Sequence, residues 1–529
     1  MSWNPFRRRE DHDEAAEAQA GAQPDARMQG EDDPTDPLIS TAVYSENCSL
    51  LHDWDGLRLE SVSIGGAAAP AFLKLSASRE SALSSALPGI LTGCEALCGL
   101  RDLLADGNAV FSAALEPAGL HFDEFETALR EGRISLRPLD LLLGMRDLAL
   151  LLVQCSGHGL SWQPGRAGLS FTEVHAAGNG LSRWQLRFLD FGALREGTGA
   201  DPSEVLTLLR PLVDAALADN RLLPNASSAD LRALLDRLAA DESLDAAAIA
   251  AGITAALNGL RLQGHGTTDN GMRRQHNEDA WLLAEIRQHS AIGSSLQLAV
   301  VADGMGGHES GEIASSLSLA MLRQQLQVSL TAPSTRPVDT AALPRQLESI
   351  IPGINRALID RSAMEQAMTG MGTTLCGIVA LSGSSTLSTG SALAAAFFNV
   401  GDSRAYLISG RELIRMTRDH SFVQQLVDSG EINADEAFDH PRKNVITRCL
   451  GGDGLEIQAD VTPFRPGPAE RILICSDGLT DALRDREIAA VLERHAEDPL
   501  PLVAQALVDA ANAAGGPDNI TVLLLDCRI

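Results

Sequence analysis

The sequence predicts an α+β protein with a mainly helical first half and a second half in which short strands alternate with helices. Three observations support this prediction. Between about residues 40 and 258, leucines recur at three- and four-residue spacing, as on the buried face of a helix. From about residue 262, short apolar runs alternate with Gly/Asp turns and two or three helical stretches. The 529 residues, 45% of them hydrophobic, suffice for more than one packed core.

The first 37 residues differ in composition from the rest. They are rich in Asp, Glu, Ala, Gln and Pro and cannot bury a core, so we expect residues 1–37 to form a disordered acidic tail. An arginine triplet, Arg7 to Arg9, could contact acidic lipid or a partner, but a solvated tail is the better reading of so short a run.

Residues 40–257 are expected to form a helical regulatory domain. Helical spacing is clearest over residues 87–104, 136–155 and 227–240, and a strand-like run, APAFLKLSA, precedes them. The change in texture places the boundary with the second domain, residues 262–527, near 255–262.

Bulk properties exclude some classes of function. A formal net charge of −28 argues against a large nucleic-acid footprint, although one arginine or a metal can still bind phosphate. The 8 cysteines lack zinc-ligand spacing, which favours buried, reduced thiols. Since no signal pattern and no apolar segment of bilayer length is present, we expect a soluble, cytoplasmic protein.

Acidic residues mark the ends of the strands predicted for the second half. LQLAVVA runs into Asp303, AAAFFNVG into Asp402 and RILICS into Asp477. The other members of the group are Glu278 and Asp279 at the start of a strand, Asp481 four residues after Asp477, and Asp518 just before ITVLLLD. One such aspartate is usually an ordinary turn residue, but a sheet would bring this many together.

Clustered carboxylates repel one another unless cations neutralise them. A ligand set of oxygen atoms without histidine or cysteine favours Mg²⁺ or Mn²⁺ over Zn²⁺. Glycine after the aspartate permits a sharp turn, so the Gly304 carbonyl can also become a ligand. The pattern indicates a centre for two or more metal ions, which can activate water for attack on phosphorus. Arg274 has a planar fork that matches phosphate oxygens, although a lone arginine is usually a surface ion-pair partner.

Eight blocks of the second half occur in a fixed order. They are GMRRQHNEDA (271–280), VVADGMGGHESGEIAS (300–315), GMGTTL (370–375), VGDSRAYL (400–407), LIRMTRDHSFV (413–423), HPRKNVITRCLGG (440–452), ICSDGLTD (474–481) and GGPDNITVLL (515–524). Together they resemble the bacterial branch of the metal-dependent serine/threonine phosphatases, the type 2C or PPM family. The resemblance covers about half of the chain, from about 262 to 527.

The resemblance implies a four-layer α/β/β/α sandwich with the metals in a channel at one end of the two sheets. Asp303 would bridge two Mn²⁺ or Mg²⁺ ions, with the Gly304 carbonyl on one ion and with Asp477 and Asp518 on the other. Glu278 and Asp279 would bind directly or through water. A weaker third ion would be held by Asp402, Asp477 and Asp481.

The implied reaction is hydrolysis of phosphoserine or phosphothreonine in proteins by a metal-bridging hydroxide, without a phosphoenzyme. Arg274 would hold the phosphate. His308 is the nearest candidate for the general acid, but residue 305 is Met where some members have histidine, so His308 could equally be structural. Residues 422–439 correspond to the variable flap that shapes substrate access. GMGTTL is expected to serve packing and tight turns.

The first half carries a weaker resemblance to protein kinases. Lys74 lies in a strand-like run and Glu95 in a helical stretch, and a His158-Gly159 turn precedes Asp190-Phe191-Gly192. In this order they resemble a reduced kinase fold, in which the lysine and glutamate would hold phosphates and the aspartate Mg²⁺. A glycine-rich loop and a catalytic-loop aspartate are missing, so the resemblance implies a pseudokinase without phosphotransfer. A helical regulatory domain with a chance LDFG sequence is an equally good reading.

The leading hypothesis is a metal-dependent hydrolase of phosphorylated protein substrates that works against a serine/threonine kinase pathway and is regulated by its N-terminal domain. A non-catalytic signalling scaffold that binds phosphoproteins or nucleotide is the alternative, and the complete carboxylate set argues against it. A phosphatase dedicated to one partner-switching regulator is a third reading. We expect no nucleic-acid partner and no membrane span.

Overall fold

The structure, a computed structural model, describes residues 48–529 apart from a set of internal segments. These are 55–56, 63–71, 78–86, 88–89, 92–99, 107–109, 116–118, 163–165, 167–168, 176–181, 189–193, 197–201, 219–221, 223–224, 242, 288–294, 307–309, 332–341, 383–393 and 453–455. The predicted tail, residues 1–37, therefore lies outside the described residues.

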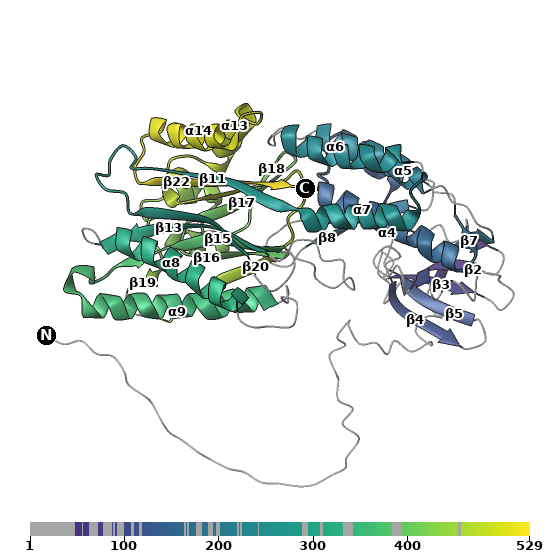
Figure 1. The fold of residues 1–529 in the computed structure, drawn as a ribbon, viewed down its shortest axis with the longest axis horizontal. Coiled ribbons are helices and arrows are strands. Elements are labelled where there is room, and N and C mark those ends of the chain that lie inside the picture. Colours follow the sequence, from purple (N-terminus) through teal and green to yellow (C-terminus); the bar gives the residue numbers. More distant parts are fainter. Residues whose placement is uncertain are drawn as a thin grey trace, which may run out of the picture. The chain divides into compact units, whose positions relative to one another are not determined.

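The second half contains two antiparallel sheets, shown in Figure 1. The five-stranded sheet has the order β11 (Arg261–Asp269), β22 (Ile520–Arg528), β21 (Arg471–Cys475), β17 (Arg404–Ser409) and β18 (Glu412–Arg415). The seven-stranded sheet has the order β19 (Leu450–Gly451), β14 (Gly372–Thr373), β13 (Ser295–Met305), β15 (Leu375–Ser382), β16 (Ala394–Val400) and β20 (Asp460–Phe464), and β12 (Asp279–Arg287) also pairs with β13.

Alternate residues of the central strands explain why the two sheets stack between helices. In β13, Val300 belongs to the core beneath α8 (Ser310–Thr331) and α9 (Leu343–Met364), whereas Val301 belongs to the core between the sheets. In β22, Leu523 faces the other sheet and Leu524 faces the core beneath α13 (Asp485–Arg494) and α14 (Leu500–Ala513). Successive side chains of a strand point to opposite faces, so a continuous apolar run fills a core on each side. The predicted four-layer arrangement of the second half is confirmed (Figure 1).

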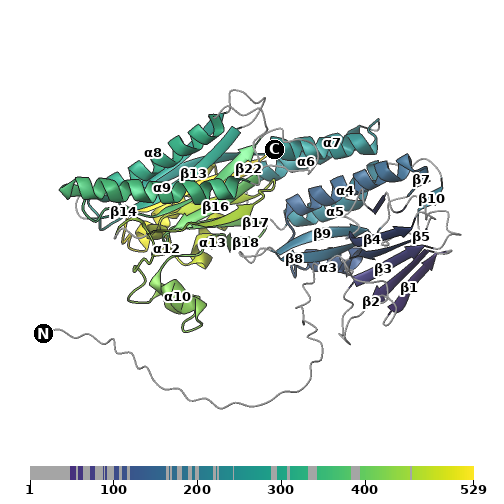
Figure 2. The same cartoon turned by 90° about the horizontal axis from the view of Figure 1, so that it is seen from below.

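Strand register brings the acidic residues to one end of this sandwich, here called the carboxylate edge. Asp279 pairs directly with Asp303 across β12 and β13. Asp402 follows the last residue of β16, Asp477 follows β21, and Asp518 precedes β22. Figure 2 shows α10 (Phe422–Asp428) standing out from the sandwich beside α12 (Asp477–Thr480).

The first half is not mainly helical, so that part of the predicted fold class is wrong. Its described residues include ten strands, in a sheet of order β1 (Cys48–Trp54), β2 (Leu57–Val62), β3 (Phe72–Ala77), β5 (Val110–Leu115) and β4 (Leu100–Asp106), a sheet of β6 (Leu120–His121), β8 (Leu169–His175) and β9 (Ser182–Phe188), and the pair β7 (Leu160–Ser161) and β10 (Arg195–Glu196). The end of the predicted helix 87–104 forms part of β4. Leucine spacing in short apolar runs fits a strand as well as a helix, and here pairing with β5 decides.

The longer helical predictions of the first half are confirmed. Residues 136–155 correspond to α4 (Pro138–Gly157) and residues 227–240 to α6 (Asn225–Ala240). These helices share one core with α3 (Phe122–Arg130), α5 (Ser203–Ala218) and α7 (Ala246–Gly259). No described helix combines the length and the apolar character needed to cross a bilayer.

One loop of the second half enters this first-half core. Ala469, fully buried, belongs to the same apolar cluster as Leu139 on α4. Beside it, Nε and Nη2 of Arg137 donate hydrogen bonds of 2.6 and 2.9 Å to the two carboxylate oxygens of Glu470. The Glu470 side chain is 0% exposed and that of Arg137 6%, so this is a buried ion pair. At the end of β22, Arg528 pairs with Asp230 of α6 at 2.6 Å.

Candidate metal centre

The structure brings the aspartates of the carboxylate edge close together. The charge of Asp303 is coupled to those of Asp279, Asp477 and Asp402, and the charge of Asp477 is coupled to those of Asp402, Asp481 and Asp518. Asp279 and Asp402 are buried. The sequence prediction that these residues meet at one end of the sheets is therefore in agreement with the structure.

Burial raises the pKa of these carboxyl groups. The pKa of Asp279 and that of Asp402 are each raised to about 7, chiefly by desolvation. Desolvation, followed by repulsion from neighbouring aspartates, raises the pKa of Asp303 and that of Asp477 well above the usual range. Desolvation also raises the pKa of Asp481 and of Glu278. Carboxylates in such surroundings need either protons or cations to be stable at neutral pH.

Three buried carboxylate oxygens at this edge have no hydrogen-bond partner. They are the Oδ1 atoms of Asp279, Asp402 and Asp477. A buried oxygen without a partner is costly, and a hard divalent cation satisfies carboxylate oxygens. Within the described part of the chain, no three acidic, histidine or cysteine side chains form a complete metal-binding group by themselves. The raised pKa values and the unpaired oxygens are therefore the structural evidence that cations fit here.

Hydroxyl groups fix one side of Asp279. Its Oδ2 atom accepts hydrogen bonds of 2.7 Å from Ser476 Oγ and from Thr521 Oγ1. These donors lie at the ends of β21 and β22, so the hydrogen bonds join the two sheets at the carboxylate edge. The remaining oxygen, Oδ1, is the one left for a cation or water.

The backbone of Asp303 is held by the block GMGTTL. The Asp303 carbonyl accepts hydrogen bonds from the Thr374 N–H at 2.8 Å and from Thr373 Oγ1 at 2.9 Å, and its N–H donates to Thr374 Oγ1 at 2.9 Å. The block was expected to serve packing and turns, and its threonines also orient a candidate ligand. At Gly304, a Cβ atom would lie 2.2 Å from the carbonyl oxygen of Gly311, so the close approach of α8 requires glycine.

Asn519 is an organising residue that the sequence reasoning missed. Its Oδ1 accepts from the Glu278 N–H at 2.9 Å, and its Nδ2 donates to the carbonyls of Asn270 and His276 at 3.1 and 2.9 Å. Its own N–H donates to Oδ1 of Asp518 at 2.9 Å. Asn519 thus ties the loop that carries Glu278 to the start of β22. The motif GGPDN contained the signal, because an amide beside a predicted ligand can orient it.

Arg274 lies at the carboxylate edge, as predicted. Its Nη2 donates to Oδ2 of Asp518 at 2.7 Å, and its side chain is 52% exposed. The Asp518 hydrogen bond raises the pKa of Arg274 further, so the guanidinium is charged. His308, the candidate general acid, lies outside the described residues.

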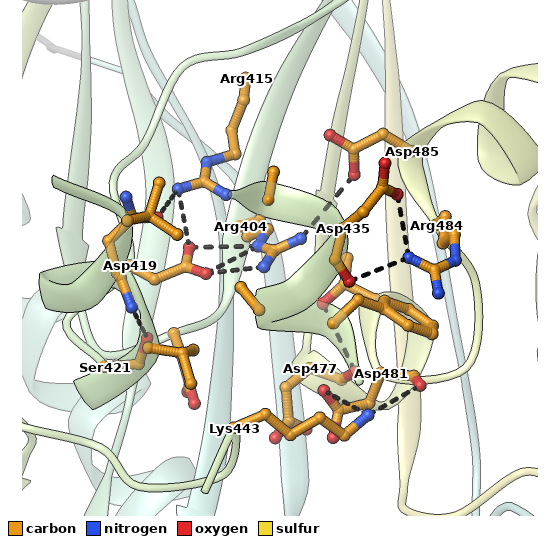
Figure 3. A pocket seen from close by; sticks show the side chains of 18 of the residues that line it. Arg404, Arg415, Asp419, Ser421, Asp435, Lys443, Asp477, Asp481, Arg484 and Asp485 are labelled. Carbon is orange, nitrogen blue, oxygen red and sulfur yellow. Dashed lines mark hydrogen bonds and ion pairs between the residues drawn. The ribbon is translucent and has the colours of Figure 1, made fainter. Parts of the chain in front are cut away.

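The predicted flap covers a cavity next to Asp477 and Asp481. The cavity of 520 Å³ is lined by residues of α10, of α11 (Ala434–Phe438) and of the carboxylate edge. Figure 3 shows Lys443 reaching Asp481, whose Oδ1 lies 3.3 Å from Nζ. Arg484 pairs with Asp435 of the flap at 3.0 Å. Cations and carboxylates alternate around the cavity, which suits a polar substrate segment more than an apolar ligand.

Comparison with known proteins gives one consistent result for the second half. The family model described as protein phosphatase 2C matches residues 268–509. The serine/threonine phosphatase stp of Listeria monocytogenes is 34% identical over 260 residues, which cover 49% of this chain and 93% of that protein. The serine/threonine protein phosphatase PstP of Mycobacterium tuberculosis is 35% identical over 262 residues, 49% of this chain and 44% of that protein.

Solved structures show similar matches. The phosphatase Stp1 of Staphylococcus aureus is 32% identical, with a TM-score of 0.42, and the match covers 50% of this chain and 95% of that one. The catalytic domain of PstP in complex with two manganese ions is 32% identical, with a TM-score of 0.40, and the match covers 51% of this chain and all of that one.

Proposed function

This chain belongs to the protein phosphatase 2C family, and on that premise we propose how its residues carry out and regulate the removal of phosphate from phosphoserine and phosphothreonine in proteins. The enzyme is a serine/threonine protein phosphatase. The observation that carries the mechanism is the group of buried aspartates with raised pKa values at the shared end of the two sheets.

We assign the metal ligands as follows. Asp303, Asp477 and Asp518, with the Gly304 carbonyl, would hold two Mn²⁺ or Mg²⁺ ions, and Asp402 and Asp481 would complete a third, weaker site with Asp477. Glu278 and Asp279 would act directly or through water, and the hydroxyls on Asp279 support the latter by occupying one of its oxygens. When bound, the cations supply Lewis acidity and make water acidic enough to attack phosphorus at neutral pH.

Arg274 would bind the phosphate of the substrate. Its half-exposed guanidinium stands at the rim of the carboxylate edge, where it can exchange Asp518 for phosphate oxygens in a bidentate arrangement. The leaving serine or threonine oxygen needs a proton, and His308 remains the candidate donor. The flap residues around the 520 Å³ cavity would hold the peptide on either side of the phosphorylated residue.

The first half would regulate this centre from the opposite end of the sheets. Glu470 directly precedes β21, and Asp477 follows it, so the strand spans about 20 Å between the buried ion pair and the metal edge. Likewise, β22 runs from Asp518 to Arg528, which pairs with α6. A change in how the first half holds these strands would therefore reach two proposed ligands through a rigid element.

A reduced kinase-like origin of the first half remains part of the proposal. Lys74 lies on β3, the third strand of an antiparallel sheet, where the phosphate-binding lysine of kinases is found. His158 ends α4 as expected. Glu95, Asp190, Phe191 and Gly192 lie outside the described residues. We further propose a cytoplasmic protein that opposes a serine/threonine kinase pathway.

The test is phosphate release from a phosphothreonine peptide by the full-length protein with Mn²⁺, with Mg²⁺ and with EDTA. We expect metal-dependent turnover that Asp477→Asn abolishes and that Asp509→Asn, an exposed aspartate of α14, leaves unchanged. Absence of turnover on peptides, with activity on one cellular phosphoprotein, would favour the dedicated-substrate reading. Metal binding without turnover on any phosphoprotein would favour the scaffold.

A further inference from the structure

The turn that carries Asp402 is held by one histidine. Gly401 has a φ of 113°, and a Cβ atom there would lie 2.6 Å from the Thr374 side chain, so the turn requires glycine. The Gly401 N–H donates to Nδ1 of His420 at 3.2 Å, and the Gly401 carbonyl accepts from the His420 N–H at 2.8 Å. Asn399 Nδ2 donates to the same carbonyl at 3.0 Å. Both backbone polar groups of Gly401 therefore bond to His420.

These contacts determine which nitrogen of His420 carries the proton. A backbone N–H can only donate, so Nδ1 is the acceptor and Nε2 bears hydrogen. Nε2 lies 3.1 Å from Oδ2 of Asp460, which accepts that hydrogen. Arg448 Nη1 lies 3.2 Å from Nε2 and donates to Oδ1 of Asp460 at 3.0 Å. Burial lowers the pKa of His420, which favours the neutral ring that the Gly401 contact needs.

The residues on either side of His420 are also fixed. Asp419 accepts from Nη2 of Arg404 at 2.7 Å, and Ser421 Oγ accepts from the N–H of Gln424 at the start of α10. The His420 carbonyl accepts from the Thr447 N–H at 2.7 Å. The imidazole is therefore a rigid support. By contrast, Oδ1 of Asp402 has no hydrogen-bond partner, so the backbone turn has a large part in setting that carboxylate's direction.

We propose that His420 is a positioning residue for the third cation site: through Gly401 it holds Asp402 in the orientation in which its carboxylate binds the weakest of the metal ions. The inference rests on the proposed function, because it requires a cation at Asp402. His420 itself touches neither substrate nor metal. Residues that support metal ligands in this way change metal affinity by about 10- to 100-fold when replaced.

Two substitutions separate the hydrogen bond from the bulk of the ring. Asparagine places an acceptor oxygen near the position of Nδ1, whereas the longer glutamine places its polar group near Nε2. We expect His420→Gln to weaken Mn²⁺ binding at the Asp402 site by about 10- to 100-fold, and His420→Asn to weaken it clearly less. The full-length protein is titrated with Mn²⁺, and free Mn²⁺ is followed by electron paramagnetic resonance, which counts sites and affinities without using activity.

Asp402→Asn identifies which binding step belongs to this site. In that background, His420→Gln should change Mn²⁺ binding no further, because the carboxylate that it positions is gone. Equal weakening at every site in both His420 variants, additive losses in the double variant, or no change in either would overturn the inference. Absence of Mn²⁺ binding by the wild-type protein would overturn the metal centre and the inference with it, which distinguishes failure of the proposed function from failure of the role of His420.

Discussion

Arg274 donates a hydrogen bond of 2.7 Å to Asp518, so the candidate phosphate ligand and a candidate metal ligand form one ion pair. The two side chains are 52% and 24% exposed. Pairs this exposed contribute at most about 1 kcal/mol to stability. A phosphate dianion near Arg274, or a cation at Asp518, can therefore replace either partner at small cost. The pair holds the guanidinium at the rim until substrate arrives.

Replacement of Arg274 tests this role. Arg274→Ala is expected to raise KM for a phosphothreonine peptide and to lower kcat/KM by about 10- to 100-fold, since a hydrogen bond between charged groups contributes about 1.5–3 kcal/mol. Arg273→Ala is the matched control, because Arg273 is adjacent and also exposed. Steady-state kinetics with Mn²⁺ measure both variants. Equal losses in the two would show that Arg274 contributes only general positive charge.

The buried carboxylates predict how Mn²⁺ stabilises the protein at different pH values. The pKa of Asp279 and that of Asp402 are about 7 in the folded protein, against about 3.9 in an unfolded chain. For a group whose pKa is raised by folding, the contribution to stability is complete below the unfolded pKa and is lost as pH rises through the folded pKa. Above pH 7, these residues therefore destabilise the metal-free fold.

Cations compete with protons for the same oxygens, so they restore the lost stability where the carboxylates ionise. We expect the difference in Tm between Mn²⁺ and EDTA to be small near pH 5.5 and to grow from about pH 6 to about pH 8, across the pKa of about 7. Thermal unfolding in matched buffers measures it. Asp402→Asn should reduce the growth. A shift of equal size at all pH values would contradict binding at these carboxylates.

The positions of the candidate ligands could be predicted from the sequence because each is coded locally. Asp303, Asp402 and Asp477 end apolar strands, and antiparallel register then places the ends together. Their supporting residues could not be predicted in this way. Asn519 bonds to backbone groups 249 and 243 positions earlier, and His420 bonds to Gly401 across a turn. Such partners depend on the folded path of the chain, which no local pattern encodes.

The strands of the first half failed prediction for a different reason. Leucine has no strong preference for strand over helix, so its spacing was ambiguous over residues 87–104. In the structure, pairing with β5 fixes Leu100–Asp106 as a strand. In α4, by contrast, apolar residues persist over 20 residues, longer than an ordinary strand, and the helix was predicted correctly.

The ion pair between Arg137 and Glu470 predicts a large effect on stability. Arg137→Met leaves the Glu470 carboxylate buried without its charged partner, which is expected to cost about 3–5 kcal/mol of unfolding free energy. Adding Glu470→Met should recover most of this loss, because two apolar side chains can replace a buried pair. Urea unfolding of the full-length protein measures the three variants. If the double variant is as unstable as Arg137→Met, the pair is not the source of the effect. Phosphatase activity of the folded double variant then shows whether the link to β21 also regulates catalysis.

Ala469 predicts an unusual response to glycine. Its φ is 58°, the left-handed region, which costs a residue with a Cβ atom about 1–2 kcal/mol. Glycine removes that cost, but it loses a buried methyl group, about 0.8 kcal/mol, and adds freedom to the unfolded chain, about 0.4–1 kcal/mol. These effects nearly cancel, so Ala469→Gly is expected to change unfolding free energy by less than about 1 kcal/mol.

Ala504 is the matched control, since it is equally buried but lies inside α14. Ala504→Gly loses a methyl group and helix propensity without relieving any backbone strain, so it should destabilise by about 1–2 kcal/mol. Urea unfolding at one pH, with Mn²⁺ held constant, compares the two variants. A loss at Ala469 as large as that at Ala504 would show that the loop between β20 and β21 gains more from its methyl contact with the first-half core than it loses to the left-handed backbone.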